Sequence, residues 1–135
     1  GEVGQSREDP GCARHAGDPN QAEESIVNQL LEDRLGRVEA KLTAATGGAS
    51  LCSISKVAGS VPAAKYLEGR LAVLLQLRRS PSAIQEALAA LDNLRDEWAS
   101  ELERVTREAF GPDWLAYRAG GVDELDELAT SLRTN

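Results

Sequence analysis

The sequence is poor in the side chains that most often bind metals or catalyse reactions. Its 135 residues include one histidine, two cysteines and no methionine. A zinc site needs three or four ligands from converging segments, and the soft candidates are limited to Cys12, His15 and Cys52. A nucleophilic Cys or Ser needs an adjacent base, and His15 lies in a charged N-terminal stretch. We therefore expect no metal, no cofactor and no catalytic residue, while the pairing of Cys12 with Cys52 stays open.

Carboxylates are plentiful, but their spacing does not indicate acid–base or di-iron chemistry. Di-iron bundles combine inward carboxylates with Glu-x-x-His spacings, and no Glu precedes the single histidine by three residues. We expect the adjacent carboxylate pairs to lie on the polar faces of helices. These pairs are Glu23-Glu24, Asp96-Glu97, Asp123-Glu124 and Asp126-Glu127.

The chain also lacks an excess of positive charge and any long apolar run. Its net charge of −7 repels phosphate backbones and anionic lipid headgroups. The one compact basic candidate is Arg78-Arg79, which we expect to face the negative C-terminal pole of a helix. No apolar run approaches the roughly 20 residues that span a bilayer. The sequence thus predicts a soluble protein that neither binds nucleic acid nor inserts into a membrane.

Aromatic residues make up only 4% of the sequence, against 41% hydrophobic residues in total. The core must then be aliphatic, which is typical of helical bundles, and the hydrophobic residues recur at helical spacing. We predict three main helices over residues 19–46, 61–79 and 81–110 and a short fourth helix over 123–133. Because the connections are short, neighbouring helices should be antiparallel. The predicted fold class is therefore an all-α, antiparallel helical bundle.

Signals that start and stop helices set these boundaries. Asp18 is a suitable N-cap before Pro19, and Ser80 before Pro81, whereas Gly47-Gly48 and Gly111-Pro112 end helices. We interpret Gly120-Gly121 as a break that precedes the last helix. Residues 1–18 are charged and glycine-rich, so we expect a flexible tail followed by one domain over 19–135. The chain starts with Gly and has no Met, which is compatible with removal of a targeting peptide and leaves the compartment open.

Two further features concern the arrangement of the helices. The helix over 61–79 is apolar around much of its girth, which predicts that it is the central element. Gly36 and Gly69 lie inside predicted helices, where each glycine costs about 1 kcal/mol relative to alanine. We expect the close approach of a second helix to explain Gly69.

The strongest functional signal is aromatic. Three of the five aromatic residues fall between Phe110 and Tyr117, around a helix break. They could cap the end of the core, or Trp114 and Tyr117, supported by Leu115, could form an exposed anchor for a partner. Gly111-Pro112 and Gly120-Gly121 on its two sides would free this segment from the long third helix, so that it projects from the end of the bundle. We therefore predict a non-enzymatic protein-interaction or assembly protein, such as an accessory subunit, whose partner is another protein. The alternative is a bundle that binds a small apolar ligand or pigment between its helices.

Overall fold

The computed structural model describes residues 19–46, 62–79 and 83–134, and this part of the chain is almost entirely helical. The helices are α1 (Pro19–Thr46), α3 (Pro62–Arg78), α4 (Ile84–Arg107) and α5 (Pro112–Arg133). The predicted all-α bundle is confirmed, and α1 has the predicted bounds. Cys12, His15 and Cys52, the caps Asp18 and Ser80, and the predicted tail lie outside the described residues.

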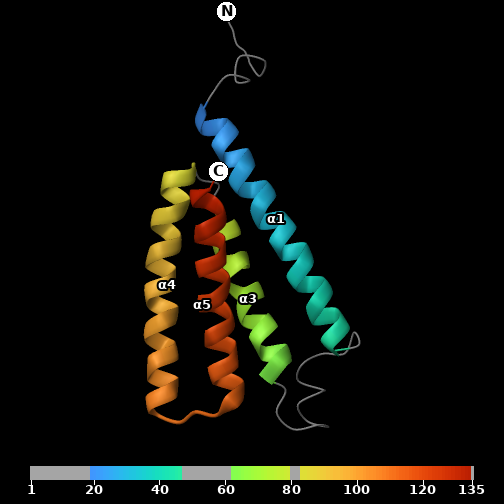
Figure 1. Cartoon of the computed structure of the whole chain (residues 1–135), viewed down its shortest axis with the longest axis vertical. Coiled ribbons are helices and arrows are strands. Elements are labelled where there is room, and N and C mark those ends of the chain that lie inside the picture. The colour runs from blue at the N-terminus through green and yellow to red at the C-terminus, as the bar shows by residue number, and fades with distance from the viewer. Residues whose placement is uncertain (1–18, 47–61, 80–82, 135) are drawn as a thin grey trace, which may run out of the picture.

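Successive helices run in opposite directions, as predicted (Figure 1). This alternation makes α3 and α5 parallel to each other. These two helices nevertheless form the most extensive contact in the molecule, α4 packs mainly on α5, and α1 packs mainly on α3. The parallel α3–α5 pair is therefore the backbone of the bundle, with α1 and α4 on its two sides.

The core is aliphatic, as the composition predicts, with Trp98 as its one buried aromatic ring among the described residues. Val73, Leu74 and Leu125 are fully buried, and burial of a side chain of this size contributes about 1.5–3 kcal/mol. The largest share of buried positions belongs to α5 rather than to α3. The helix predicted to be central, α3, contacts α1, α4 and α5, and it shares the middle of the bundle with α5, which contacts α3 and α4.

The predicted break at Gly120-Gly121 is wrong, because both glycines lie in the middle of the continuous helix α5, which is therefore longer than the short helix predicted over 123–133. An added Cβ at Gly120 would lie 2.0 Å from the backbone oxygen of Tyr66. At Gly121 it would lie 2.3 Å from Cε3 of Trp98. Real Cβ atoms do not approach other heavy atoms so closely. The glycines therefore allow α5 to touch α3 and the Trp98 ring, and they do not end a helix.

Gly69 has the same role on the facing helix, which agrees with the predicted close approach. Its added Cβ would lie 1.9 Å from the backbone oxygen of Tyr117. Gly36 differs, because an added Cβ there meets nothing within 4 Å. Helix packing therefore explains Gly69, and nothing in the structure explains Gly36.

The helix predicted over 81–110 is shorter at both described ends, and local hydrogen bonds account for this. At its start, Glu23 of α1 accepts a hydrogen bond from the Ile84 N–H at 3.1 Å. After Arg107 the chain turns with Ala109 at φ 53°. The Phe110 N–H donates to the Val105 oxygen and the Ala109 N–H to the Thr106 oxygen, the pattern of a Schellman motif. Pro112 then begins α5.

Candidate functional site

The predicted anchor residues lie in the first two turns of α5, at the end of the molecule where α4 and α5 are connected (Figure 1). Trp114 is the most exposed large hydrophobic residue described, with 52% of its surface accessible. Its ring meets Tyr117 edge to face at a centroid distance of 6.2 Å. Tyr117 in turn contacts the buried ring of Trp98 at 5.1 Å. The three rings form a stack from the core to the surface.

The predicted residues therefore do not share one environment. Trp114 is exposed, whereas Leu115 and Tyr117 are half-buried. Gly111-Pro112 does separate this segment from α4, but the expectation that it projects from the bundle is wrong, since the segment is part of α5 and Tyr117 packs into the α3–α5 contact. A rigid helix, rather than a projecting loop, presents the Trp114 ring.

A hollow of about 140 Å³ lies beside Trp114, lined by Lys65, Asp113, Trp114 and Tyr117. The Oδ1 atom of Asp113 is buried and has no hydrogen-bond partner in the described part of the chain. Lys65 forms an ion pair with Glu68 at 3.2 Å. The hollow thus combines two aromatic rings with the carboxylate of Asp113 and the ammonium group of Lys65.

Arginines lie against the aromatic rings at the same end of the bundle. The Arg104 guanidinium lies 4.9 Å from the centroid of the exposed Phe110 ring. Arg118 lies over the Trp98 ring at 4.5 Å. Cations stacked on aromatic rings are favourable, and Trp, Tyr and Arg are the residues enriched at binding hot spots. The sequence signal for this surface was the clustering of aromatic residues around Gly111-Pro112.

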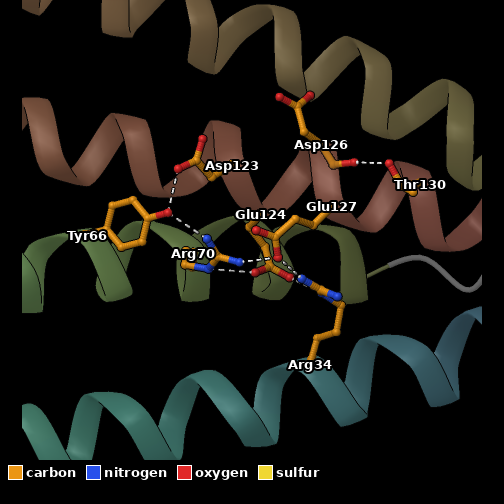
Figure 2. A network of polar contacts seen from close by, with 8 residues as sticks. All are labelled: Arg34, Tyr66, Arg70, Asp123, Glu124, Asp126, Glu127 and Thr130. Carbon is orange, nitrogen blue, oxygen red and sulfur yellow. Dashed lines mark hydrogen bonds and ion pairs between the residues drawn. The ribbon is translucent and has the colours of Figure 1, made fainter.

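A second polar site, which the sequence reading missed, joins three helices in the middle of the molecule (Figure 2). The carboxylate of Glu124 on α5 is completely buried. It accepts a hydrogen bond from Nε of Arg34 on α1, and Nε of Arg70 on α3 lies 3.0 Å from its second oxygen. The expectation that Asp123-Glu124 lies on a polar face is wrong for Glu124. A buried carboxylate needs such partners, because a charge taken out of water without them is very costly.

Glu127 lies one turn further along α5, above Glu124, and is shared by the same two arginines. Its Oε1 accepts hydrogen bonds from Arg34 Nη2 at 2.8 Å and from Arg70 Nη2 at 2.6 Å. Burial opposes ionisation of Glu127, but the hydrogen bonds and positive charges of Arg70 and Arg34 together outweigh it and lower the pKa of the carboxyl below its ordinary value of 4.5. Burial likewise opposes the charge of Arg34, but the hydrogen bonds and negative charges of Glu124 and Glu127 together outweigh it, so the pKa of Arg34 is raised.

Tyr66 extends the network toward the end of the bundle that carries Phe110, Trp114 and Tyr117, which we call the aromatic end. Its hydroxyl donates to Oδ2 of Asp123 at 2.5 Å and accepts from Nη1 of Arg70 at 2.8 Å. Burial and the bond to the Asp123 carboxylate raise the pKa of the Tyr66 hydroxyl. The hydroxyl therefore stays protonated and holds the Arg70 guanidinium in place.

Helical periodicity contained a signal for Glu124. It lies three residues after Gly121 and four before Leu128, and both of those residues are buried. Positions three and four apart share a helix face, so Glu124 belongs to the buried face of a continuous helix. The supposed break at Gly120-Gly121 concealed this relation.

An apolar cavity of about 140 Å³ lies at the opposite end of the bundle, lined mainly by aliphatic residues of all four helices. Its lining residues are Val27, Leu31, Gln76, Leu77, Ala87, Ala90, Leu91, Leu128 and Leu132. Among the described residues no group of three or more His, Cys, Asp or Glu side chains could hold a metal ion. None of the helices in the described part of the chain contains a stretch long and apolar enough to cross a membrane.

The fold and these sites define the chain as an all-α helical bundle with an exposed aromatic end and a buried arginine–glutamate network. Comparison with known protein families, curated proteins and solved structures finds no match. The functional argument therefore depends on the geometry of the chain's own residues.

Proposed function

We propose that this chain is a non-enzymatic interaction or assembly protein, such as an accessory subunit, that binds another protein through the aromatic end of the α4–α5 hairpin. The single observation that carries the proposal is the exposure of Trp114 on a rigid helix, beside a hollow of about 140 Å³. An exposed tryptophan next to a concave site is suited to anchoring a partner. Phe110, 45% exposed in the adjacent turn, extends the apolar surface.

The supporting chemistry follows the usual anatomy of a protein interface. Exposed apolar rings form a centre, and Arg104, Lys65 and Asp113 lie around them as polar groups. Such an arrangement buries apolar area while the polar groups select the orientation of the partner. The negative charge of Asp113 at the hollow favours a partner side chain that donates a hydrogen bond or carries a positive charge.

The test is capture of partners from native extract, followed by measurement of the dissociation constant for the captured protein. We expect Trp114→Ala to weaken binding by about 2–4 kcal/mol and to leave the unfolding midpoint nearly unchanged. Ile26→Ala is the matched control, since Ile26 is 41% exposed on α1 and far from the aromatic end. Equal losses from both variants, or binding unaffected by Trp114→Ala, would contradict the proposal.

The apolar cavity supports a second candidate, a bundle that binds a small apolar ligand. A cavity of about 140 Å³ is close to the size of engineered cavities that bind benzene or xenon. It is too small for a pigment, so this candidate is restricted to very small apolar molecules. Benzene should raise the unfolding temperature of the wild type and lose this effect in Ala90→Leu, which fills the cavity. Ala89→Leu is the control, because Ala89 is an exposed neighbour that does not line the cavity.

A further inference from the structure

A polar pocket of about 120 Å³ lies between α1 and α3, directly against the arginine–glutamate network. Four cationic side chains and two carboxylates line it, together with Val38. The cations are Arg34, Arg37, Lys41 and Arg70, and the carboxylates are Glu124 and Glu127. The pocket thus carries an excess of two positive charges in a chain whose net charge is −7.

The two carboxylates have different positions in this pocket. The side chain of Glu124 is 1% exposed and pairs with both arginines from beneath. The side chain of Glu127 is 53% exposed, although its Oε1 receives both guanidinium groups. Glu124 is a fixed counter-charge, whereas the Glu127 carboxylate can rotate into solvent. Its oxygen therefore occupies the point where two guanidinium groups would hold an oxyanion from solution.

Two further cationic side chains, Arg37 and Lys41, line the pocket beside Glu127 and have no ion-pair partner among the described residues. Arg37 and Lys41 lie one turn and two turns after Arg34 on α1, which places all three on one side of the helix. Both are exposed, and neither forms an ion pair within the described residues. Arginines with fixed planar donors match phosphate oxygens in pairs, and a lysine adds a mobile point charge.

We propose that this pocket binds a small phosphate-bearing compound, for which Glu127 is the internal competitor. The bound phosphate would accept hydrogen bonds from Arg34 and Arg70 in place of Glu127 and would neutralise Arg37 and Lys41. A small ligand fits better than a polyanion, because the pocket holds only about 120 Å³ and the net charge of −7 on the chain repels nucleic acid. The inference is independent of the partner surface at Trp114.

The test is calorimetric titration of the full chain with inorganic phosphate and pyrophosphate. Glu127→Gln keeps the shape of the side chain and removes the competing charge, so it should tighten binding roughly tenfold. Arg37→Ala and Lys41→Ala should each weaken binding several-fold without loss of helicity, because both side chains are exposed. Arg107→Ala is the control: it removes the same charge from an exposed position on α4 and should leave binding unchanged.

Several results would overturn the proposal. Absence of binding to wild type and Glu127→Gln up to about 10 mM phosphate or pyrophosphate would show that the pocket is only a structural ion network. An equal loss from Arg107→Ala and Arg37→Ala would mean that overall charge, rather than this pocket, attracts the anion. A phosphorylated peptide that binds more tightly than pyrophosphate would assign the pocket to a modified protein partner instead of a free small molecule.

Discussion

Gly69 in α3 and Gly36 in α1 are both interior helix glycines, yet their surroundings are opposite. At Gly69 an added Cβ would overlap the Tyr117 backbone at 1.9 Å, whereas at Gly36 it would meet nothing within 4 Å. The backbones of α3 and α5 therefore come into direct contact because glycines have no side chain to hold them apart. By contrast, α1 packs through large side chains, such as Leu31, Leu35 and Val38, and diverges from α4 and α5 toward its C-terminal end (Figure 1). A glycine in a helix thus has no fixed meaning until its neighbour is known.

The largest expected effect is at the close contact. Gly69→Ala should destabilise the chain by about 5 kcal/mol or more, in the exceptional range for a point mutation, because α3 and α5 must move apart. Circular dichroism during urea unfolding measures the change. A loss below about 1 kcal/mol would mean that the two backbones are not in contact, and the contrast between the two glycines would disappear.

The next effect concerns Glu124, which connects the α3–α5 pair to α1. Glu124→Ala should cost about 3 kcal/mol, since Arg34 and Arg70 lose their buried counter-charge. Glu103→Ala is the matched control, because Glu103 is an exposed carboxylate on α4. Urea midpoints with unchanged slopes report the difference. If both variants unfold at the same midpoint, the network does not stabilise the attachment of α1.

A smaller effect of opposite sign is expected on α1. Gly36→Ala should stabilise the chain by about 0.5–1 kcal/mol, because alanine restricts the unfolded chain and favours the helix without a clash. A rise in the unfolding temperature tests this. A fall would indicate that some segment approaches Gly36 closely.

The smallest effect is a pH dependence from Glu127. Its pKa is lowered in the folded chain, so its contribution to stability is complete above about 4.5, fades as the pH falls below that value, and vanishes below the folded pKa. The wild type should therefore lose more stability than Glu127→Gln when the pH is lowered through this range. Parallel stability profiles for the two proteins would show that the ion pairs of Glu127 contribute nothing.

Local signals predicted α1 to the residue, and the fold class, because capping residues and periodicity act within a few positions. The same kind of signal failed at Gly120-Gly121. A glycine pair that ends a helix and one that accommodates Tyr66 and Trp98 are identical in sequence. What distinguishes them is the residue packed against them, and Tyr66 lies over fifty positions away along the chain. That error hid the relation of Glu124 to Gly121, although Leu128, four residues later, already marked the buried face of the helix predicted over 123–133. Trp114 could be identified from aromatic clustering, but the half-burial of Tyr117 could not, because it depends on the position of Trp98.

The parallel α3–α5 contact also has a consequence for the order of folding. Tyr66 and Asp123, which it joins, are 57 positions apart in the sequence, whereas α4 and α5 are connected by a few residues. Because closing a long loop costs entropy before any contact rewards it, the α4–α5 hairpin should form first. Docking of α3 on this hairpin through the glycine contact then becomes the slow step of folding. It requires that Gly120 and Gly121 are already helical. Substitutions at these glycines should accordingly lower the folding rate, whereas Gly36→Ala should act mainly on unfolding.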